Sequence, residues 1–442
     1  MLKNIKQIKN LKNKTVLLRG DLDAPIKNGR VVDNFRLMRL LPTIKYLVKN
    51  GSKVIIIGHL GRPGGKIMEK FSMKPVAEEL RKLLRVDKLC KKSIKSTFVI
   101  PCLTRNPVFN NGSRIKCGMT KKEFNGFKIY IISPNICLLE NLRFYKGEEK
   151  NDLKFSKKLA GFADIYVNDA FANSHREHSS IVGISKLLPS YAGLNFEIEI
   201  KNLEKVIKNP KKPAVAIIGG MKLKTKLPLI KKLSDNFDYI LVGGRLGIEM
   251  EKLPNPSCQQ SVIPRLTRDP ETSGFSLNKW IPPVSHSARR GGHQAPCLPC
   301  LQDRQAAGRR NDKKNFDCVS GYLGNIIVPL DYIGAGKFDI GKKTIKLYTE
   351  ILEKAKTVVW NGPMGKFEDK KYMNGTRSIA NAIKKSKAYS VVGGGDIISA
   401  LHKLKMLDEF DFVSTGGGAM LEFLEKGDLV GLEALSFKSC GD

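Results

Sequence analysis

The chain has 442 residues, of which 41% are hydrophobic and 27% are charged. This length exceeds what one compact core usually supports and predicts about two or three globular domains. The formal net charge is +35, but the lysines are scattered and no long basic block with interleaved aromatic residues occurs. We therefore expect no specific nucleic-acid binding, and any affinity for polyanions would depend strongly on salt.

Two further classes of protein are disfavoured. The sequence contains no stretch of about 18 consecutive apolar residues, so we expect no membrane-spanning helix. Residues 1–14 are interleaved with lysines and lack the apolar segment of a secretory signal, so we expect a cytoplasmic protein. The nine cysteines show no disulfide framework, and reduced thiols are the expectation.

Short apolar runs that end in glycine or a polar residue alternate with helical patterns. The predicted strands cover, in chain order, residues 16–18, 54–57, 165–167, 214–218, 240–242, 357–360, 390–392 and 412–414. Residues 34–49 and 375–387 are representative of the helices between them. Strands rich in β-branched residues that alternate with helices predict βαβ units and parallel sheets. In such sheets ligands bind at the carboxyl ends of the strands.

The residues that follow the predicted strands divide the chain into two halves. Before about residue 190 they include Arg, His, Asp and Asn, and after about residue 210 they are glycines, lysines and one Asp. This division predicts an anion-binding domain over residues 1–195 and a nucleotide-binding domain over residues 196–428, joined near residues 194–203 and separated by a cleft. Residues 429–442 form a C-terminal segment.

Two segments, residues 96–122 and about 256–314, lack clear periodicity. Residues 99–107 and 262–270 share seven of nine positions, which suggests that a repeat element has been inserted twice. Such insertions are expected on surface loops, where added length costs little closure entropy. They hold Cys297 and Cys300, which with Cys258, His286 and His293 leave a zinc site as a weak alternative, because the spacing is irregular.

Eight sequence blocks resemble the phosphoglycerate kinase family and follow that family's order over nearly the whole chain outside the two odd segments. In the N-terminal half they are residues 19–25 (RGDLDAP, similar to R-x-D-x-N-x-P) with Arg36 downstream, 58–63 (GHLGRP), 138–144 (LLENLRF), and 168–171 (NDAF) followed by His175 and Arg176. In the C-terminal half they are residues 219–226 (GGMKLKTK), 360–368 (WNGPMGKFE), 393–396 (GGGD) and 414–419 (STGGGA).

The N-terminal blocks supply groups that suit an anionic substrate. Arginine offers forked donors for phosphate and carboxylate, histidine adds donors, and aspartate can hold a hydroxyl or orient an arginine. The predicted substrate-binding residues are Asp21, Asp23, Arg36, His59, Arg62, Arg143 and Arg176, while His175 can add a further donor. Each arginine taken alone could simply serve solubility. By resemblance, Arg36 would stabilise the transferring group.

The C-terminal blocks suit a nucleotide. Lysines after a strand–Gly–Gly turn can meet phosphates, and glycines let backbone N–H groups approach phosphates at a helix N-terminus. Asp396 is the predicted Mg²⁺ ligand, with magnesium bridging nucleotide phosphates. The resemblance implies nucleotide binding by Lys222, Lys226, Asn361, Glu368, Gly393, Gly394, Gly395, Asp396 and Ile397. It also implies catalytic roles for Arg36, Lys222, Gly395 and Gly418.

As a whole, the resemblance implies two doubly wound, Rossmann-like α/β domains that face a cleft, with the C-terminal segment packed near the hinge. It also implies reversible phosphoryl transfer from 1,3-bisphosphoglycerate to ADP, giving 3-phosphoglycerate and ATP. In the reverse reaction a carboxyl group accepts the phosphoryl group, and Mg²⁺ accompanies ATP or ADP. The resemblance also implies that the enzyme acts as a monomer.

Two departures from the family pattern keep alternatives open. Asp23 stands where the family pattern has Asn, and the second odd segment replaces sequence that helps wall the adenine pocket in this family. A degraded kinase that still binds glycerate is therefore one alternative. A basic nucleic-acid-binding protein is another.

Overall fold

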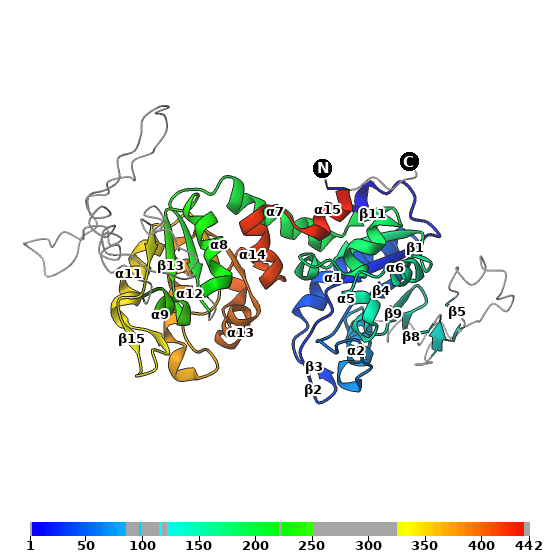
Figure 1. The fold of residues 1–442 in the computed structure, drawn as a ribbon, viewed down its shortest axis with the longest axis horizontal. Coiled ribbons are helices and arrows are strands. Elements are labelled where there is room, and N and C mark those ends of the chain that lie inside the picture. The colour runs from blue at the N-terminus through cyan, green and yellow to red at the C-terminus, as the bar shows by residue number, and fades with distance from the viewer. Residues whose placement is uncertain are drawn as a thin grey trace, which may run out of the picture. The chain divides into compact units, whose positions relative to one another are not determined.

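The computed structural model describes residues 2–84, 97–98, 115–116, 122–124, 126–220, 223–251 and 325–436. Contacts divide the chain into two units, one formed by residues 1–252 with 328–442 and the other by residues 253–327. The first unit contains two large sheets with helices packed on them (Figure 1). The zinc alternative and both copies of the repeat lie outside the described residues.

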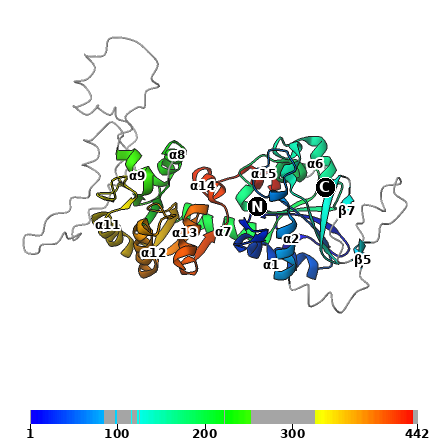
Figure 2. The same ribbon diagram turned by 90° about the horizontal axis from the view of Figure 1, so that it is seen from below.

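The N-terminal sheet has the strand order β11-β10-β1-β4-β9-β8-β7. Its strands are β1 (Thr15–Gly20), β4 (Lys53–Ile57), β7 (Lys122–Phe124), β8 (Phe127–Ser133), β9 (Ile136–Leu139), β10 (Ile165–Asp169) and β11 (Ser190–Ala192). The strands from β11 to β9 run parallel to one another, and β8 pairs antiparallel with both β9 and β7. Figure 2 shows α1 (Phe35–Lys49) and α2 (Lys74–Leu83) on one face of this sheet and α6 (Leu153–Ala160) on the other.

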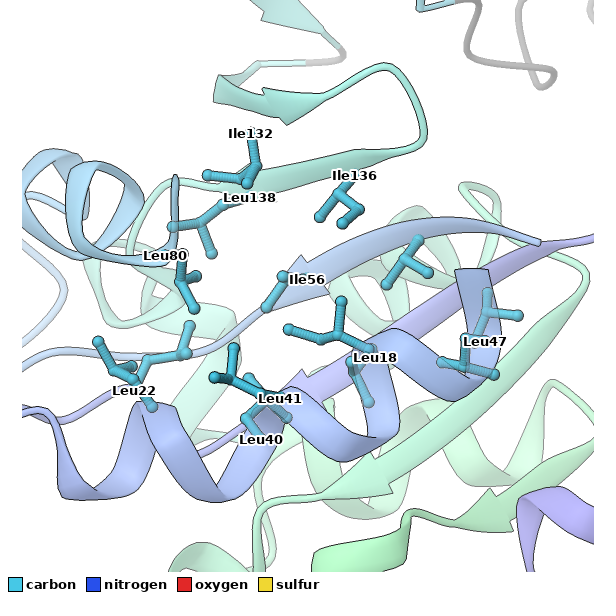
Figure 3. Packing of buried hydrophobic residues seen from close by; sticks show 14 of the residues in the cluster. Leu18, Leu22, Leu40, Leu41, Leu47, Ile56, Leu80, Ile132, Ile136 and Leu138 are labelled. Atoms are coloured by element: carbon cyan, nitrogen blue, oxygen red, sulfur yellow. The ribbon is translucent and has the colours of Figure 1, made fainter. Parts of the chain in front are cut away.

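The core of this half forms because α1 presents a leucine-rich stripe to a sheet whose central strands are buried. Leu40, Leu41 and Leu47 of α1 recur at helical spacing and face the sheet. They pack with Leu18 of β1 and Ile56 of β4, which have no exposed surface (Figure 3). The same packing holds the carboxyl ends of these strands at one edge of the sheet.

The C-terminal sheet contains five parallel strands in the order β13-β12-β17-β18-β19. Its strands are β12 (Ala214–Ile218), β13 (Tyr239–Val242), β17 (Thr357–Asn361), β18 (Tyr389–Gly393) and β19 (Phe412–Ser414). The helices of this half and of the connection are α7 (Leu194–Lys208), α8 (Leu223–Ser234), α9 (Gly244–Glu251), α11 (Lys342–Glu353), α12 (Asn374–Ser386), α13 (Gly395–Leu404), α14 (Gly417–Lys426) and α15 (Val430–Ser436).

The remaining elements are shorter. They are η1 (Ile5–Gln7), β2 (Ile26–Lys27), β3 (Arg30–Val31), η2 (Glu69–Phe71), β5 (Thr97–Phe98), β6 (Ile115–Lys116), η3 (Leu142–Phe144), α5 (Lys146–Glu149), η4 (Phe171–Asn173), η5 (Ser179–Gly183), η6 (Ile184–Lys186), β14 (Ile326–Ile327), β15 (Tyr332–Ile333), β16 (Asp339–Ile340), η9 (Lys370–Tyr372) and η10 (Leu407–Glu409). No helix among the described residues is both long and apolar enough to cross a membrane.

The predicted fold class, two doubly wound parallel sheets, is confirmed, and every predicted strand overlaps an observed one. The sequence analysis missed the antiparallel edge of the N-terminal sheet. There β8 and β9 are separated by only Pro134 and Asn135. Such a short connection can join only antiparallel neighbours, because a parallel crossover needs a dozen or more residues.

The connection between the two sheets and the end of the chain both contact the N-terminal half. Helix α7 begins at Leu194 and follows β11 in sequence. In α15, the backbone N–H of Gly431 donates to the Ser174 carbonyl at 2.8 Å, and Ala434 packs in a small cluster with Ile181 and Val182. The domain boundaries at residues 195 and 428 stay predictions.

The buried cluster predicts a difference in stability between two substitutions. Ile56→Ala should lower the free energy of unfolding by about 2–5 kcal/mol, because it leaves a cavity between β4 and α1. Met38→Ala, at a residue of α1 that is 50% exposed, should change this free energy by about 0.5 kcal/mol or less. Urea unfolding of the full chain followed by circular dichroism measures both, and equal losses would contradict this view of the core.

Candidate active site

The Arg36 guanidinium, in the first turn of α1, is held by the loop that follows β1. Its Nε lies 3.4 Å from Asp21 Oδ2, and its Nη1 donates to the Asp23 carbonyl at 3.0 Å. Its Nη2 donates to the Thr415 carbonyl at 3.3 Å. The side chain remains 30% exposed, so its charge is oriented and still accessible to a ligand.

Asp23 joins this loop to the one that follows β4. Its Oδ1 accepts a hydrogen bond from the backbone N–H of Gly61 at 2.8 Å, and Gly61 has the left-handed backbone conformation, with φ of 61°. Its Oδ2 lies 3.9 Å from Arg36 Nη1 and 3.9 Å from Nε2 of the buried His59. The two loops thus present an acid, an arginine and a histidine at one edge of the sheet.

Three more arginines gather beside these loops. Arg143 is buried and donates from Nη1 to the Gly61 carbonyl at 2.9 Å, while its Nε lies 3.2 Å from Glu149. Arg176 donates from Nε to His175 Nε2 at 3.1 Å. Its pKa is lowered by burial and then by repulsion from Arg62, which is exposed on the loop after β4. All seven predicted substrate-binding residues therefore come together.

The positive charge of this cluster is only partly neutralised. Burial lowers the pKa of Arg143 to about 10, and repulsion from Arg176 and Arg19 adds to this effect, while Glu149 opposes it. Within the described part of the chain, the buried Nη2 of Arg143 has no hydrogen-bond partner. A buried, unpartnered donor next to several cations is the arrangement that an anionic ligand relieves.

Sequence reasoning missed the layer of polar side chains beneath this cluster. Arg19, Glu148 and Ser180 are fully buried and lie in one hydrogen-bonded chain. A signal for Arg19 was present, because a charged residue ended an otherwise apolar run in the predicted first strand. Glu148 and Ser180 gave no such signal, since both lie outside the motifs.

In the C-terminal half, Lys226 of α8 points to the end of β17. Its Nζ donates to Asn361 Oδ1, and Asn361 Nδ2 donates to the Gly393 carbonyl at the end of β18. Burial lowers the pKa of Lys226 to about 8, although the charge of Asp396 acts to raise it. Three predicted nucleotide-binding residues from three elements are therefore linked by hydrogen bonds. They lie at the strand ends next to the point between β12 and β17 where the strand order of the sheet changes direction.

The glycines before α13 leave its N-terminus open. Gly394 has φ of 123°, and a Cβ added at Gly395 would meet no atom within 4 Å. The first N–H groups of α13 can therefore approach a phosphate. Asp396 lies exposed in the first turn, whereas the Ile397 side chain is buried, so only the backbone of Ile397 can face a ligand.

The remaining predicted residues are less closely linked to this group. Glu368 is exposed on the loop between β17 and η9. A Cβ at Gly418 would lie 3.4 Å from His175 Nε2, so this backbone passes close to the N-terminal arginine cluster. Lys222 lies outside the described residues.

A magnesium ion fits the donor set at Asp396. Among the described residues no group of three or more His, Cys, Asp or Glu side chains could hold a metal ion. A single exposed carboxylate next to an open helix N-terminus suits Mg²⁺, because this ion is usually bound by one or two carboxylates together with substrate phosphates and water.

Glu199 of helix α7 is a buried carboxylate that accepts hydrogen bonds from the C-terminal half. Glu199 Oε1 accepts hydrogen bonds from the backbone N–H and the hydroxyl of Thr415, at 2.6 and 2.7 Å. Burial raises the pKa of Glu199 to about 7, although these hydrogen bonds oppose the shift. Burial likewise raises the pKa of Asp169, at the end of β10, to about 7.

An arginine cluster at the strand ends of one parallel sheet, and a lysine with a glycine-opened helix at those of another, define an enzyme of the phosphotransferase class. The sequence model of the family described as phosphoglycerate kinase matches residues 5–104 and 131–427. The chain belongs to the phosphoglycerate kinase family. The resemblance seen in the motifs and the kinase function that it predicted are thereby confirmed.

Individual relatives match nearly the full length of the chain. A phosphoglycerate kinase of Finegoldia magna is 39% identical over 426 residues, which cover 96% of this chain and 97% of that protein. One of Thermosipho africanus is 38% identical over 436 residues, covering 97% and 96% respectively. Among solved structures, the phosphoglycerate kinase of Coxiella burnetii is 30% identical, with a TM-score of 0.67 and 99% of each chain covered.

The raised pKa of Glu199 predicts how stability depends on pH. A carboxyl group whose folded pKa lies above its unfolded value stabilises the fold below the unfolded pKa, and this contribution is lost as pH rises through the folded pKa. In the wild type, Glu199 should therefore lower the free energy of unfolding by roughly 2–3 kcal/mol as pH rises from about 4.5 to 7. The Glu199→Gln variant should lack this contribution to the decline. Urea unfolding at several pH values measures this slope.

The matched control is Glu204→Gln on the same helix, where the exposed carboxylate pairs with Lys208. This control should leave the pH slope unchanged. Asp169 should leave part of the slope in Glu199→Gln, but a slope as steep as that of the wild type would show that Glu199 does not contribute to it.

Proposed function

We propose that this chain catalyses reversible phosphoryl transfer from 1,3-bisphosphoglycerate to ADP, giving 3-phosphoglycerate and ATP. In the reverse direction the acceptor is the carboxyl group of 3-phosphoglycerate. The observation that carries the proposal is the arginine cluster around the unpartnered Nη2 of Arg143, because it requires a small, multiply charged anion. We further propose that the enzyme acts as a monomer in the cytoplasm and binds neither nucleic acid specifically nor a membrane.

The N-terminal loops hold the glycerate. Arg62, Arg143 and Arg176 bind the non-reacting phosphate, since their mutual repulsion falls when an anion binds between them. His59 adds a donor to the same anion. Asp21 and Asp23 keep Arg36 oriented toward the carboxyl group that gives or receives the phosphoryl group.

The C-terminal loops hold the nucleotide. Lys226 and the N–H groups of Gly393, Gly394 and Gly395, which lead from β18 into α13, bind its phosphates, and Asn361 keeps Lys226 in place. Asp396 would hold Mg²⁺, which supplies charge neutralisation at the nucleotide phosphates when bound. Lys222 and the backbone at Gly418 would contact the transferred group. The backbone of Ile397 would contact the phosphates, and Glu368 would contact the ribose.

The transfer itself needs positioning and charge rather than covalent chemistry by the protein. A carboxylate oxygen of the glycerate and the leaving oxygen of the nucleotide lie in line with the moving phosphorus. Negative charge on the three equatorial oxygens is stabilised by Arg36 and Lys222, and by backbone N–H groups at Gly395 and Gly418. Exclusion of water prevents loss of the phosphoryl group to hydrolysis.

A coupled assay of ATP formation from 1,3-bisphosphoglycerate and ADP tests this function. Arg36→Ala should lower kcat by about 100-fold or more, because it removes a preorganised charge at the transferring group. The matched control is Arg30→Ala, which deletes an exposed arginine of β3 and should leave kcat within about twofold. A folded wild-type chain that binds 3-phosphoglycerate but forms no ATP would refute the proposal.

Lys226 makes nucleotide affinity depend on pH. Its pKa of about 8 in the free protein means that it loses its charge above this pH, whereas bound phosphates favour the charged form. ADP binding should therefore take up a proton above pH 8, and the affinity should fall by up to about tenfold per pH unit. Calorimetry in buffers of different ionisation enthalpy measures the uptake.

Lys226→Arg provides the comparison, because a guanidinium stays charged over this range. Its ADP affinity should be nearly constant between pH 8 and 9.5. An equal decline in both proteins would assign the titration to another group.

A further inference from the structure

Arg19 is the one arginine among the described residues whose whole surface is buried, and each of its partners can be read from the structure. Its Nε donates to Ser180 Oγ at 2.9 Å, and its Nη1 donates to the Gly20 carbonyl. Its Nη2 lies 3.0 Å from Nδ1 of His59. Arg19 therefore joins the polar layer beneath the site to the histidine of the loop after β4.

The direction of every hydrogen bond in this chain of side chains is fixed. A guanidinium carries only donors, so Ser180 Oγ accepts from Arg19 and gives its own proton to Glu148 Oε1, 2.5 Å away. For the same reason His59 Nδ1 must accept from Arg19 and cannot carry a proton. Glu148 has no exposed surface, and burial raises its pKa, whereas the charge of Arg19 and the hydrogen bonds from Ser180 oppose this shift. Arg19 and Glu148 thus form a buried pair of opposite charge that Ser180 bridges.

The other ring nitrogen of His59 faces the substrate loops. Its Nε2 lies 3.9 Å from Asp23 Oδ2, the same oxygen that lies 3.9 Å from Arg36 Nη1. This separation is too long for a hydrogen bond, so the contact with Asp23 does not occupy an N–H at Nε2. An N–H at Nε2 therefore remains available to a ligand that binds beside Asp23 and Arg36.

We propose that Arg19 is a positioning residue that locks His59 in the neutral tautomer with its proton on Nε2, so that this N–H is presented to the bound anion. Ser180 and Glu148 hold Arg19 in the orientation that this lock requires. The identity of the anion as phosphoglycerate rests on the proposed function, whereas the tautomer is a property of the free protein.

Two physical effects support the lock. A proton on Nδ1 would face the N–H of Arg19 and leave a buried donor unpartnered, which disfavours that tautomer by on the order of tenfold to a hundredfold. Burial lowers the pKa of His59 well below its usual range, and the charges of Arg19, Arg143, Arg176 and His178 lower it further. The doubly protonated ring is therefore disfavoured as well.

Nitrogen-15 NMR of the full chain tests the tautomer without any substrate. The chain has only 6 histidines, so selective ¹⁵N-histidine labelling gives a simple spectrum, and the His59→Gln variant assigns the signals of His59. The wild type should show an unprotonated Nδ1 and a protonated Nε2, unchanged between about pH 6 and 8. A proton on Nδ1, or on both nitrogens at pH 7, would overturn the proposal even if no Arg19 variant folded.

A pair of variants tests the role of Arg19. Arg19→Lys keeps a donor-only cation and should preserve the tautomer, whereas Arg19→Gln offers a carbonyl acceptor and should raise the Nδ1–H fraction by about tenfold. In the kinase assay, Arg19→Gln should raise KM for 3-phosphoglycerate by about tenfold and leave KM for ATP within about twofold. A folded Arg19→Gln with an unchanged tautomer ratio would refute the lock.

The failure of the proposed function would look different. The wild type could show the Nε2–H tautomer and Arg19→Gln a raised Nδ1–H fraction while the chain has no kinase activity. This result would support the lock and refute phosphoglycerate as the anion that it serves. An active enzyme in which Arg19→Gln shifts the tautomer and leaves KM for 3-phosphoglycerate unchanged would overturn the role of Arg19 in presenting the N–H.

Discussion

Arg19 and Arg143 place two guanidinium groups inside the protein, at the edge of one sheet and within electrostatic range of each other. Arginine stays protonated there, so the repulsion must be offset by acids in fixed positions. Glu148 interacts with Arg19, and Glu149 pairs with Arg143. The strand order of the N-terminal sheet makes this pairing possible, because the parallel neighbours β1, β4 and β9 bring residues from distant sequence positions to one edge.

In the proposed function, the two halves bind phosphate with different cations. In the N-terminal half, arginines keep their charge at all physiological pH values and are oriented by carboxylates. In the C-terminal half, Lys226 is oriented by the neutral amide of Asn361 and titrates near pH 8. The proposed glycerate site thus keeps its charge at every physiological pH, whereas the proposed nucleotide site loses charge above about pH 8 unless phosphates bind.

The parallel sheets were predictable because runs such as residues 54–57 are fully apolar and β-branched, which fits strands covered on both faces. The site loops were predictable because their residue types recur in family motifs. The buried polar side chains that hold the site residues in place were not predictable. Arg19 meets Ser180 across 161 residues of sequence, and no local pattern indicates which buried hydroxyl or acid will partner an arginine. The β8–β9 hairpin was missed because Pro134 and Asn135 were not read as a turn.

The departure at Asp23 is consistent with the polarity of this network. Once Arg19 assigns the His59 proton to Nε2, donors from His59 and Arg36 both face the outer side chain atom of residue 23. An asparagine could accept the Gly61 N–H through its amide oxygen, but its NH₂ would then oppose two other donors. A carboxylate places an acceptor there instead and adds a negative charge among three nearby cations, Arg36, Arg143 and Arg176. Asp23 therefore favours the assembled loops in the free protein, while the same charge weakens the attraction of the site for an anionic substrate.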